Sequence, residues 1–195
     1  TGSGKSTIVH LLLRLYDVTA GQIRLNGTDI RKIPTETLHQ AFGIVFQSDV
    51  LFADTIAENI RFGRELTDEQ LKMAARYAQA EEFISTKEDR FAFQLSRGSN
   101  LSGGQKQRLL IARALAGSSP VLVLDDSSSA LDYKTDASLR QAIRDHMEDT
   151  TSIIIAQRIS SIMQSDHILV LDHGSCIGYG THEELIRTCR IYQEI

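Results

Sequence analysis

The chain has 195 residues, a formal net charge of −4 and a hydrophobic fraction of 42%. These values are typical of a globular protein with one large domain or two small ones. The acidic balance argues against a nucleic-acid-binding surface, which is usually basic, so we expect no nucleic-acid partner. No apolar run approaches the roughly 20 residues that span a bilayer, so a membrane role would require a partner or another part of the polypeptide.

Helical periodicity and capping signals recur along the chain. In chain order, we expect helices at residues 6–16, 35–41 and 54–62, from Thr67, after Ser102, at residues 133–147 and from Thr181. At Thr67, Ser102 and Thr181 a Gln or Glu three residues further on completes a capping box, which marks a helix start.

Short apolar runs predict the strands. We expect one hairpin in "GQIRLNGTDI", turned at Asn26-Gly27, and another in "HILVLDHGSCIGY". Further strands are expected in "FGIVFQ", "PVLVLDD" and "TSIIIAQ", the last two buried because their apolar residues run continuously. Such strands separated by helices predict an α/β fold, with a mainly parallel sheet covered by helices and a small antiparallel portion.

The first residues, "TGSGKST", match the end of a P-loop. Glycines let consecutive backbone N–H groups curl around phosphate oxygens, and the following helix points its positive end at the anion. Lys5 is expected to reach the β- and γ-phosphates, and the Ser6 hydroxyl to bind Mg²⁺. The predicted phosphate-binding residues are Thr1, Gly2, Ser3, Gly4, Lys5, Ser6 and Thr7. The alternative is a flexible Gly/Ser terminus, because the first Gly of the full motif would lie upstream of Thr1.

An acid at the end of a second strand supports the P-loop interpretation. In P-loop proteins such an acid holds the Mg²⁺ shell, and Asp125 at the end of "VLVLD" occupies that position. The two features together predict ATP and Mg²⁺ as ligands.

The pentapeptide "LSGGQ", residues 101–105, lies between these two features. By itself it could be a glycine turn with a capping box. With the P-loop and the acid-ended strand, it resembles the signature of the nucleotide-binding domain of ATP-binding cassette (ABC) proteins, over residues 1 to about 185. The segments "LFADTIAENI" and "NLSGGQ" are similar to those of exporters whose membrane helices precede the cassette on one polypeptide.

The resemblance implies a domain organisation and a set of partners. Residues 1–195 would be a P-loop NTPase domain that lacks its N-terminal strands, with a helical subdomain at about residues 48–118 that carries the signature. The implied partners are a second nucleotide-binding domain and transmembrane domains, the latter on the same full-length polypeptide. Such a chain would act at the cytoplasmic face of the cell membrane and hydrolyse ATP to power export.

The resemblance also implies roles for individual residues. Gln47 would contact Mg²⁺ and take part in catalysis. In the head-to-tail pairs of this family, the signature binds the nucleotide of the opposite subunit, and the "SALD" segment crosses to that subunit. The residues that match these two motifs are Ser102, Gly103, Gly104 and Gln105 in the signature, and Asp132 in "SALD".

Two residues depart from the family pattern. Asp126 stands where catalytic subunits have a water-activating Glu, and its carboxylate lies one methylene, about 1.5 Å, nearer the backbone. Gln157 stands where the family has a switch His, and an amide can donate a hydrogen bond but carries no positive charge. Because a misplacement of about 1 Å can cost on the order of 10²-fold in rate, we expect this chain's own site to be slow.

The intact signature would then complete the faster site of a different partner subunit, as in heterodimeric multidrug exporters. Two alternatives stay open at this point. The chain could be a non-hydrolysing regulatory half, with turnover only at the partner's site, or a soluble ABC-type ATPase.

Overall fold

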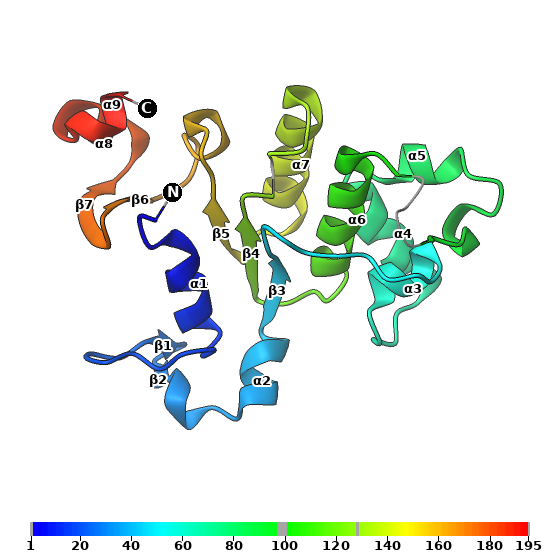
Figure 1. The fold of residues 1–195 in the computed structure, drawn as a ribbon, viewed down its shortest axis with the longest axis horizontal. Helices are drawn as coiled ribbons and strands as arrows, with labels where there is room; N and C mark the ends of the chain where they lie inside the picture. Colours follow the sequence, from blue (N-terminus) through cyan, green and yellow to red (C-terminus); the bar gives the residue numbers. More distant parts are fainter. Residues whose placement is uncertain (1, 97–100, 128, 195) are drawn as a thin grey trace. The chain divides into compact units, whose positions relative to one another are not determined.

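A computed structural model of the chain describes residues 2–96, 101–127 and 129–194. It divides into two compact units, Thr1–Ala41 with Ala156–Ile195, and Phe42–Ile155. Figure 1 labels their helices and strands. Within the described residues, no helix has both the length and the apolar character needed to cross a membrane.

The first unit combines helices with two antiparallel hairpins. Its elements are α1 (Lys5–Leu12), β1 (Arg24–Leu25), β2 (Thr28–Asp29), the 3₁₀ turn η1 (Ile30–Lys32), α2 (Thr35–Gln40), the 3₁₀ turn η3 (Ile159–Ser161), β6 (Ile168–Asp172), β7 (Ser175–Gly180), α8 (His182–Thr188) and α9 (Arg190–Glu194). Both predicted hairpins are confirmed, as β1–β2 and β6–β7. Asn26 and Gly27 turn the first with φ angles of 47° and 79°, the positive values that such two-residue turns require.

Helix α1 is shorter than the predicted 6–16 segment. It ends at Leu12, and Arg14 takes a φ of 54° in the left-handed region, which stops the helical hydrogen-bond pattern. Helix α8 begins at the predicted capping box of Thr181 and Glu184. Helix α9 was not predicted from the sequence, and it places Tyr192 in a small core with Leu185 and Cys189, against β6 and β7.

The second unit is built on a parallel sheet. Its elements are β3 (Phe42–Val45), α3 (Ile56–Arg61), α4 (Asp68–Tyr77), α5 (Glu81–Ser85), the 3₁₀ turn η2 (Arg90–Ala92), α6 (Gly103–Leu115), β4 (Val121–Asp125), α7 (Tyr133–His146) and β5 (Thr151–Ile155). The strand order is β3-β4-β5, and both pairings are parallel. The predicted α/β fold with a parallel sheet and small antiparallel portions is therefore confirmed.

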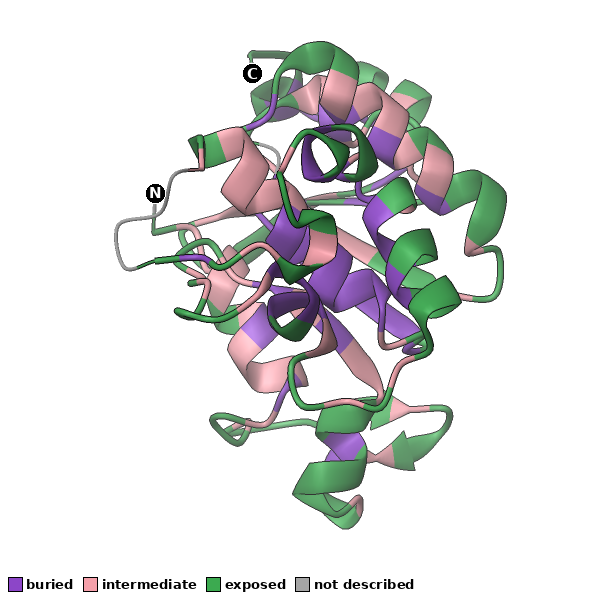
Figure 2. Cartoon of the chain, turned by 90° about the vertical axis from the view of Figure 1, so that its right-hand side faces the viewer, coloured by how far each residue is buried: buried purple, intermediate pink, exposed green. Residues whose placement is uncertain are grey.

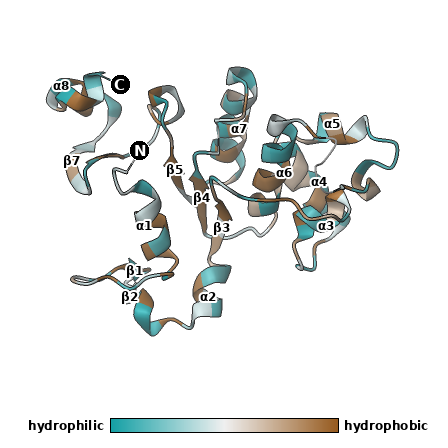
Figure 3. Cartoon of the chain, viewed as in Figure 1, coloured by the Kyte–Doolittle hydropathy of each residue, from teal (hydrophilic) through white to brown (hydrophobic). Residues whose placement is uncertain are grey.

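The central strand β4 is buried along its whole length, and the apolar character of the sheet strands is visible in Figure 3. The prediction that "TSIIIAQ" forms an equally buried strand is wrong. In β5 the residues Thr151 and Ser152 are exposed, and Ile153 to Ile155 are only half-buried. Among the described residues, β5 pairs with β4 on one side only, which leaves its other edge uncovered in this structure.

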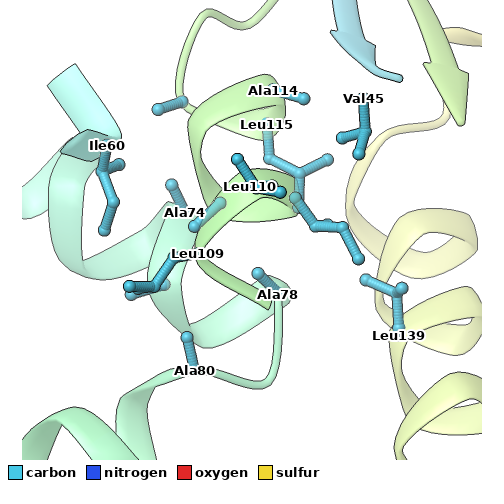
Figure 4. Packing of buried hydrophobic residues seen from close by; sticks show 14 of the residues in the cluster. Val45, Ile60, Ala74, Ala78, Ala80, Leu109, Leu110, Ala114, Leu115 and Leu139 are labelled. Atoms are coloured by element: carbon cyan, nitrogen blue, oxygen red, sulfur yellow. The ribbon is translucent and has the colours of Figure 1, made fainter. Parts of the chain in front are cut away.

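Helix α6 is the centre of the second unit. All residues from Leu109 to Leu115 are buried, so this half of the helix is covered on every side (Figure 2). In Figure 4 the side chains of Leu109 and Leu110 lie among residues from α3, α4, β3 and α7. The signature at the start of α6 is thus attached to a helix that the core holds firmly.

Close contact between α6 and β3 depends on a glycine. A Cβ atom built on Gly43 would lie 2.5 Å from the carbonyl oxygen of Ala114, a distance that real Cβ atoms essentially never show. Because the obstacle is backbone, the helix or the strand would have to move to accommodate any side chain at this position.

Replacing this glycine should therefore destabilise the domain. In Gly43→Ala, the smaller entropy of the unfolded chain favours folding by about 0.4–1 kcal/mol. Overpacking against Ala114 disfavours folding by about 1–3 kcal/mol, so we expect the free energy of unfolding to fall. The measurement is thermal unfolding of the full-length protein. Gly103→Ala is the control, because a Cβ there meets nothing within 4 Å. Equal unfolding temperatures for the two variants would contradict this packing.

Candidate functional site

The P-loop residues surround the start of α1 in the first unit. Thr1 lies outside the described residues. Gly2 and Gly4 take φ angles of 87° and 96°, which strain any residue with a side chain. The first backbone bond of the helix runs from Ile8 N–H to the Gly4 carbonyl at 3.1 Å. In an α-helix the first N–H groups point out of the positive end, so this helix start has the orientation that an anion site requires.

Two contacts hold this loop in shape. Lys5 Nζ donates a hydrogen bond to Ser3 Oγ at 2.7 Å, so the ammonium group lies against the loop itself. The Gly174 N–H donates to the Ser3 carbonyl at 3.2 Å, and a Cβ on Gly4 would lie 3.6 Å from the Gly174 Cα. The contact of Gly174 with this loop was not predicted from the sequence. The signal for it was the His173-Gly174 pair between two strand-like runs, which here forms a tight turn with two positive φ angles.

The signature residues form the start of α6 in the second unit. Ser102 is the N-cap, and its Oγ accepts from Gln105 N–H at 3.2 Å while Gln105 Oε1 accepts from Ser102 N–H at 3.0 Å. This capping box leaves the N–H groups of Gly103 and Gly104 without acceptors within the helix. Space around Gly103 is open, since a Cβ there meets nothing within 4 Å. The start of α6 is therefore open to an anion, and its binding of phosphate stays a prediction.

The "SALD" segment passes beside the signature. A Cβ on Gly104 would lie 3.1 Å from the carbonyl oxygen of Ala130, so the backbones approach closely there. Asp132 caps α7: its carboxylate accepts from Thr135 N–H at 2.9 Å and from Thr135 Oγ1 at 2.7 Å. These two hydrogen bonds, the hydroxyl's first, hold the pKa of Asp132 below its ordinary value. The exposed carboxylate thus has a structural task in addition to its predicted place at a subunit interface.

The two adjacent acids have different environments. Asp125 is the last residue of β4 and is 4% exposed. Asp126 is half-buried, has a φ of 49°, and donates its N–H to the Ile155 carbonyl at 2.9 Å. Its own carbonyl accepts from Ser129 Oγ at 3.0 Å. Asp is among the few residues that tolerate this left-handed conformation, so the chain turns at Asp126 immediately after the strand.

Gln47 is carried by a turn that follows β3. The turn is closed by a bond from Asp49 N–H to the Phe46 carbonyl at 3.3 Å, and Gln47 is exposed on it. Since β3 and β4 are parallel and pair Val45 with Leu124, Gln47 and the two acids follow the same edge of the sheet. Gln157, also exposed, follows β5 by two residues and belongs to the first unit with the P-loop.

The oxygen-bearing residues fit Mg²⁺ rather than a softer metal. In the part of the chain that the structure describes, no three His, Cys, Asp or Glu side chains are grouped to hold a metal ion. Mg²⁺ needs no such cage, because it usually binds one or two protein carboxylates together with waters and substrate phosphates. The predicted ligands Ser6, Gln47 and Asp125 offer hydroxyl, amide and carboxylate oxygens, which are the hard donors that this ion prefers.

A model of the ABC transporter family matches residues 1–129. The chain belongs to the ABC transporter family. The resemblance to an ABC nucleotide-binding domain is thereby confirmed, and the ATP-binding domains of this family are ATPases coupled to transport.

Relatives of this ABC domain are considerably longer. An uncharacterized ABC transporter ATP-binding protein of Mycobacterium tuberculosis is 44% identical over 199 residues, which cover 100% of this chain and 34% of that protein. The β-(1→2)glucan export ATP-binding/permease protein NdvA of Rhizobium johnstonii is 43% identical over 187 residues, which cover 95% of this chain and 32% of that protein. The structure of a bacterial Atm1-family ABC exporter with ATP bound matches with a TM-score of 0.94 at 40% identity, covering 100% and 34%. The chain spans about a third of the length of these relatives.

Helices α4 and α6 begin with the same type of capping box. Comparing mutations in the two boxes distinguishes the structural role of Ser102 from its predicted chemical role. Thr67 and Gln70 form on α4 the same capping box that Ser102 and Gln105 form on α6, with bonds of 3.2 and 2.9 Å. We expect Ser102→Ala and Thr67→Ala to cost similar stability, about 1 kcal/mol each.

Only Ser102→Ala should lower ATP turnover, by at least about 10-fold, because it removes a hydroxyl at the predicted phosphate-binding start of α6. The measurements are thermal unfolding and steady-state ATPase activity of the full-length protein in its assembled form. If the two variants lose turnover equally, the serine has no role beyond its cap.

Proposed function

We propose that this chain is the ATP-binding and hydrolysing domain that powers export across a membrane, as part of a longer ABC transporter. The main supporting observation is that the chain has glycine-flanked helix N-termini in both motifs, at Lys5 in the P-loop and at Gly103 in the signature. Each offers backbone N–H groups to an anion. Further support comes from the names of the relatives, which include an export permease and an exporter with ATP bound.

In this proposal, different residues of the chain would bind the phosphates and the Mg²⁺ ion. The P-loop N–H groups and Lys5 would bind the β- and γ-phosphates, while Ser6, Asp125 and Gln47 would hold Mg²⁺. When bound, this ion neutralises negative charge on the phosphates. Because enzymes of this kind act mainly by positioning and charge stabilisation, the contribution of each residue depends on small distances.

In this proposal the signature serves a second nucleotide-binding domain. Residues 102–105 would bind the γ-phosphate of a nucleotide held by the partner's P-loop, and Asp132 would lie at the same interface. The capped but otherwise open start of α6 supports this assignment, because it presents N–H groups where space is free.

The chain's own site is proposed to be the slower of the two. Asp126 has a shorter side chain than Glu and would hold the attacking water less closely, and Gln157 cannot add positive charge near the γ-phosphate. The partner subunit would then be a different protein that carries Glu and His at these positions. A non-hydrolysing regulatory half is the extreme form of this proposal, in which all turnover occurs at the partner's site.

A paired aromatic surface supports attachment to transmembrane domains. Phe52 and Phe62 are 50% and 54% exposed, their rings stack with centroids 5.7 Å apart, and Val50 beside them is 54% exposed. Exposed apolar side chains gathered in this way are typical of a contact with another domain. We propose that this surface, within the helical subdomain of about residues 48–118, contacts transmembrane domains on the same polypeptide at the cytoplasmic face of the membrane. A soluble ABC-type ATPase would have no need of it.

Restoring the family's two residues should speed the chain's own site. In full-length protein assembled with its partner, we expect Asp126→Glu combined with Gln157→His to raise ATP hydrolysis by about 10-fold or more at that site. The longer carboxylate approaches the water, and the imidazole adds positive charge. Single-turnover ATPase measurements with the partner's P-loop inactivated isolate the effect.

Adding Lys5→Ala to the double variant is the control, since it should remove the gain. A rate that stays at the level of the unmodified chain would mean that Asp126 and Gln157 are not what limits this site.

A further inference from the structure

Arg113, near the end of α6, is a buried cation with an unusual set of partners. It is 6% exposed. Its Nε donates to the Asn59 carbonyl at 2.8 Å, its Nη2 to Asn59 Oδ1 at 3.2 Å, and its Nη1 to the Val50 carbonyl at 3.0 Å. One planar guanidinium thus joins α6 to α3 and to the segment between β3 and α3.

The same group reaches the turn that carries Gln47. Asp49 closes that turn, and its Oδ1 lies 3.7 Å from Arg113 Nη1. The Asp49 carboxylate also accepts from Val50 N–H at 2.9 Å, so Arg113 contacts the last residue of the turn and the residue that follows it. Replacement of Arg113 would leave this end of the turn without its link to α6.

Aromatic rings cover the guanidinium on its outer side. Its carbon lies 4.6 Å from the centre of the Phe62 ring and 5.4 Å from that of Phe52. Arg is suited to this arrangement because a flat, weakly hydrated cation can stack on rings while its edges donate hydrogen bonds. The surface proposed to contact transmembrane domains is therefore built directly on Arg113.

Asn59 completes the connection from the side of α3. It is 1% exposed, its Oδ1 accepts from Phe52 N–H at 2.8 Å, and its Nδ2 donates to the carbonyls of Phe52 and Thr55 at 3.0 and 2.9 Å. Burial lowers the pKa of Arg113, and Asp49 acts in the opposite direction. A buried cation needs acceptors of this kind, because an unpaired one would be very costly.

Arg113 and the signature lie near opposite ends of the same helix, α6. Arg113 and the signature residue Ser102 are on the same α-helical segment, about 16 Å apart at 1.5 Å per residue. The buried half of α6 between them has little room to bend. A displacement of the Gln47 turn that pulls on Arg113 would therefore move the signature.

We propose that Arg113 is a positioning residue that ties the Gln47 turn to the signature helix. Through it, a displacement of the Gln47 turn is passed to the nucleotide that the partner holds against the signature. The inference rests on the proposed function, because it takes the roles of Gln47 and of the signature from there.

Arg64 provides a matched control. It is also partly buried between α3 and α6, with a pKa lowered by burial, and it donates to the carbonyls of Arg61 at 3.0 Å, of Ile60 at 3.2 Å and of Arg113. Its guanidinium is bonded to backbone near the ends of the two helices, and none of these bonds reaches the Gln47 turn. Arg64→Lys therefore tests the loss of a buried guanidinium without the loss of the proposed link.

The experiment is a double-mutant cycle in the full-length, assembled protein, using Arg113→Lys, Gln47→Ala and both together. Lys keeps the charge but cannot hold the Val50 and Asn59 oxygens at once.

We expect Arg113→Lys to lower the ATPase kcat by about 10-fold, as a misplaced group does, with the KM for ATP changed by less than about 2-fold. In protein that already carries Gln47→Ala, Arg113→Lys should lower kcat by less than about 2-fold. The reason is that the effects of two mutations do not add when one residue acts through the other. Arg64→Lys should change kcat by less than about 2-fold in both backgrounds.

Three outcomes would overturn the inference: an unchanged kcat in Arg113→Lys, losses that multiply in the double variant, or an equal loss in Arg64→Lys. Thermal unfolding of each variant shows whether stability alone explains a loss. If the unmodified assembled protein has no ATP turnover, the proposed function itself fails, and that result is distinct from a failure of the cycle.

Discussion

The packing of α6 is the constraint on which the second unit depends. Its C-terminal half is buried on every side and lies against β3 so closely that only a glycine, Gly43, fits beneath Ala114. This burial fixes the direction of the helix, and thereby the place where Gly103 and Gly104 present their N–H groups. It also brings Arg113 to the carbonyls of Val50 and Asn59. One helix therefore carries the proposed anion-binding start at one end and a polar junction at the other.

The two acids after β4 illustrate how strand geometry separates neighbouring side chains. Asp125 continues the strand and is buried, whereas the left-handed conformation of Asp126 turns the chain and leaves that residue half-buried. In the proposed site, these two neighbouring residues would take separate roles, Asp125 towards Mg²⁺ and Asp126 towards the attacking water. The proposed weakness of this site comes from length and charge: one methylene is missing at Asp126, and an amide replaces an imidazole at Gln157.

Much of this architecture could be predicted from the sequence because it depends on local rules. The capping boxes at Thr67, Ser102 and Thr181, the Asn26-Gly27 turn and the buried strand β4 follow from short-range patterns. The partial exposure of β5 could not be predicted, because an apolar run does not reveal how many neighbouring strands the described residues supply. The support of the P-loop by Gly174 and the partners of Arg113 join residues far apart in sequence, and neither spacing nor composition encodes such contacts. The site residues themselves came from motifs, and their roles stay predictions.

The central claim is that this chain contributes little hydrolysis of its own and completes a faster site for a different partner. Its most direct test is single-turnover ATP hydrolysis by the assembled full-length protein carrying Asp126→Asn, which removes the base and leaves the P-loop intact. We expect this variant to retain more than about half of the hydrolysis, since most turnover would occur at the partner's site. A fall to background, or an assembly that contains only copies of this chain and hydrolyses ATP rapidly, would contradict it.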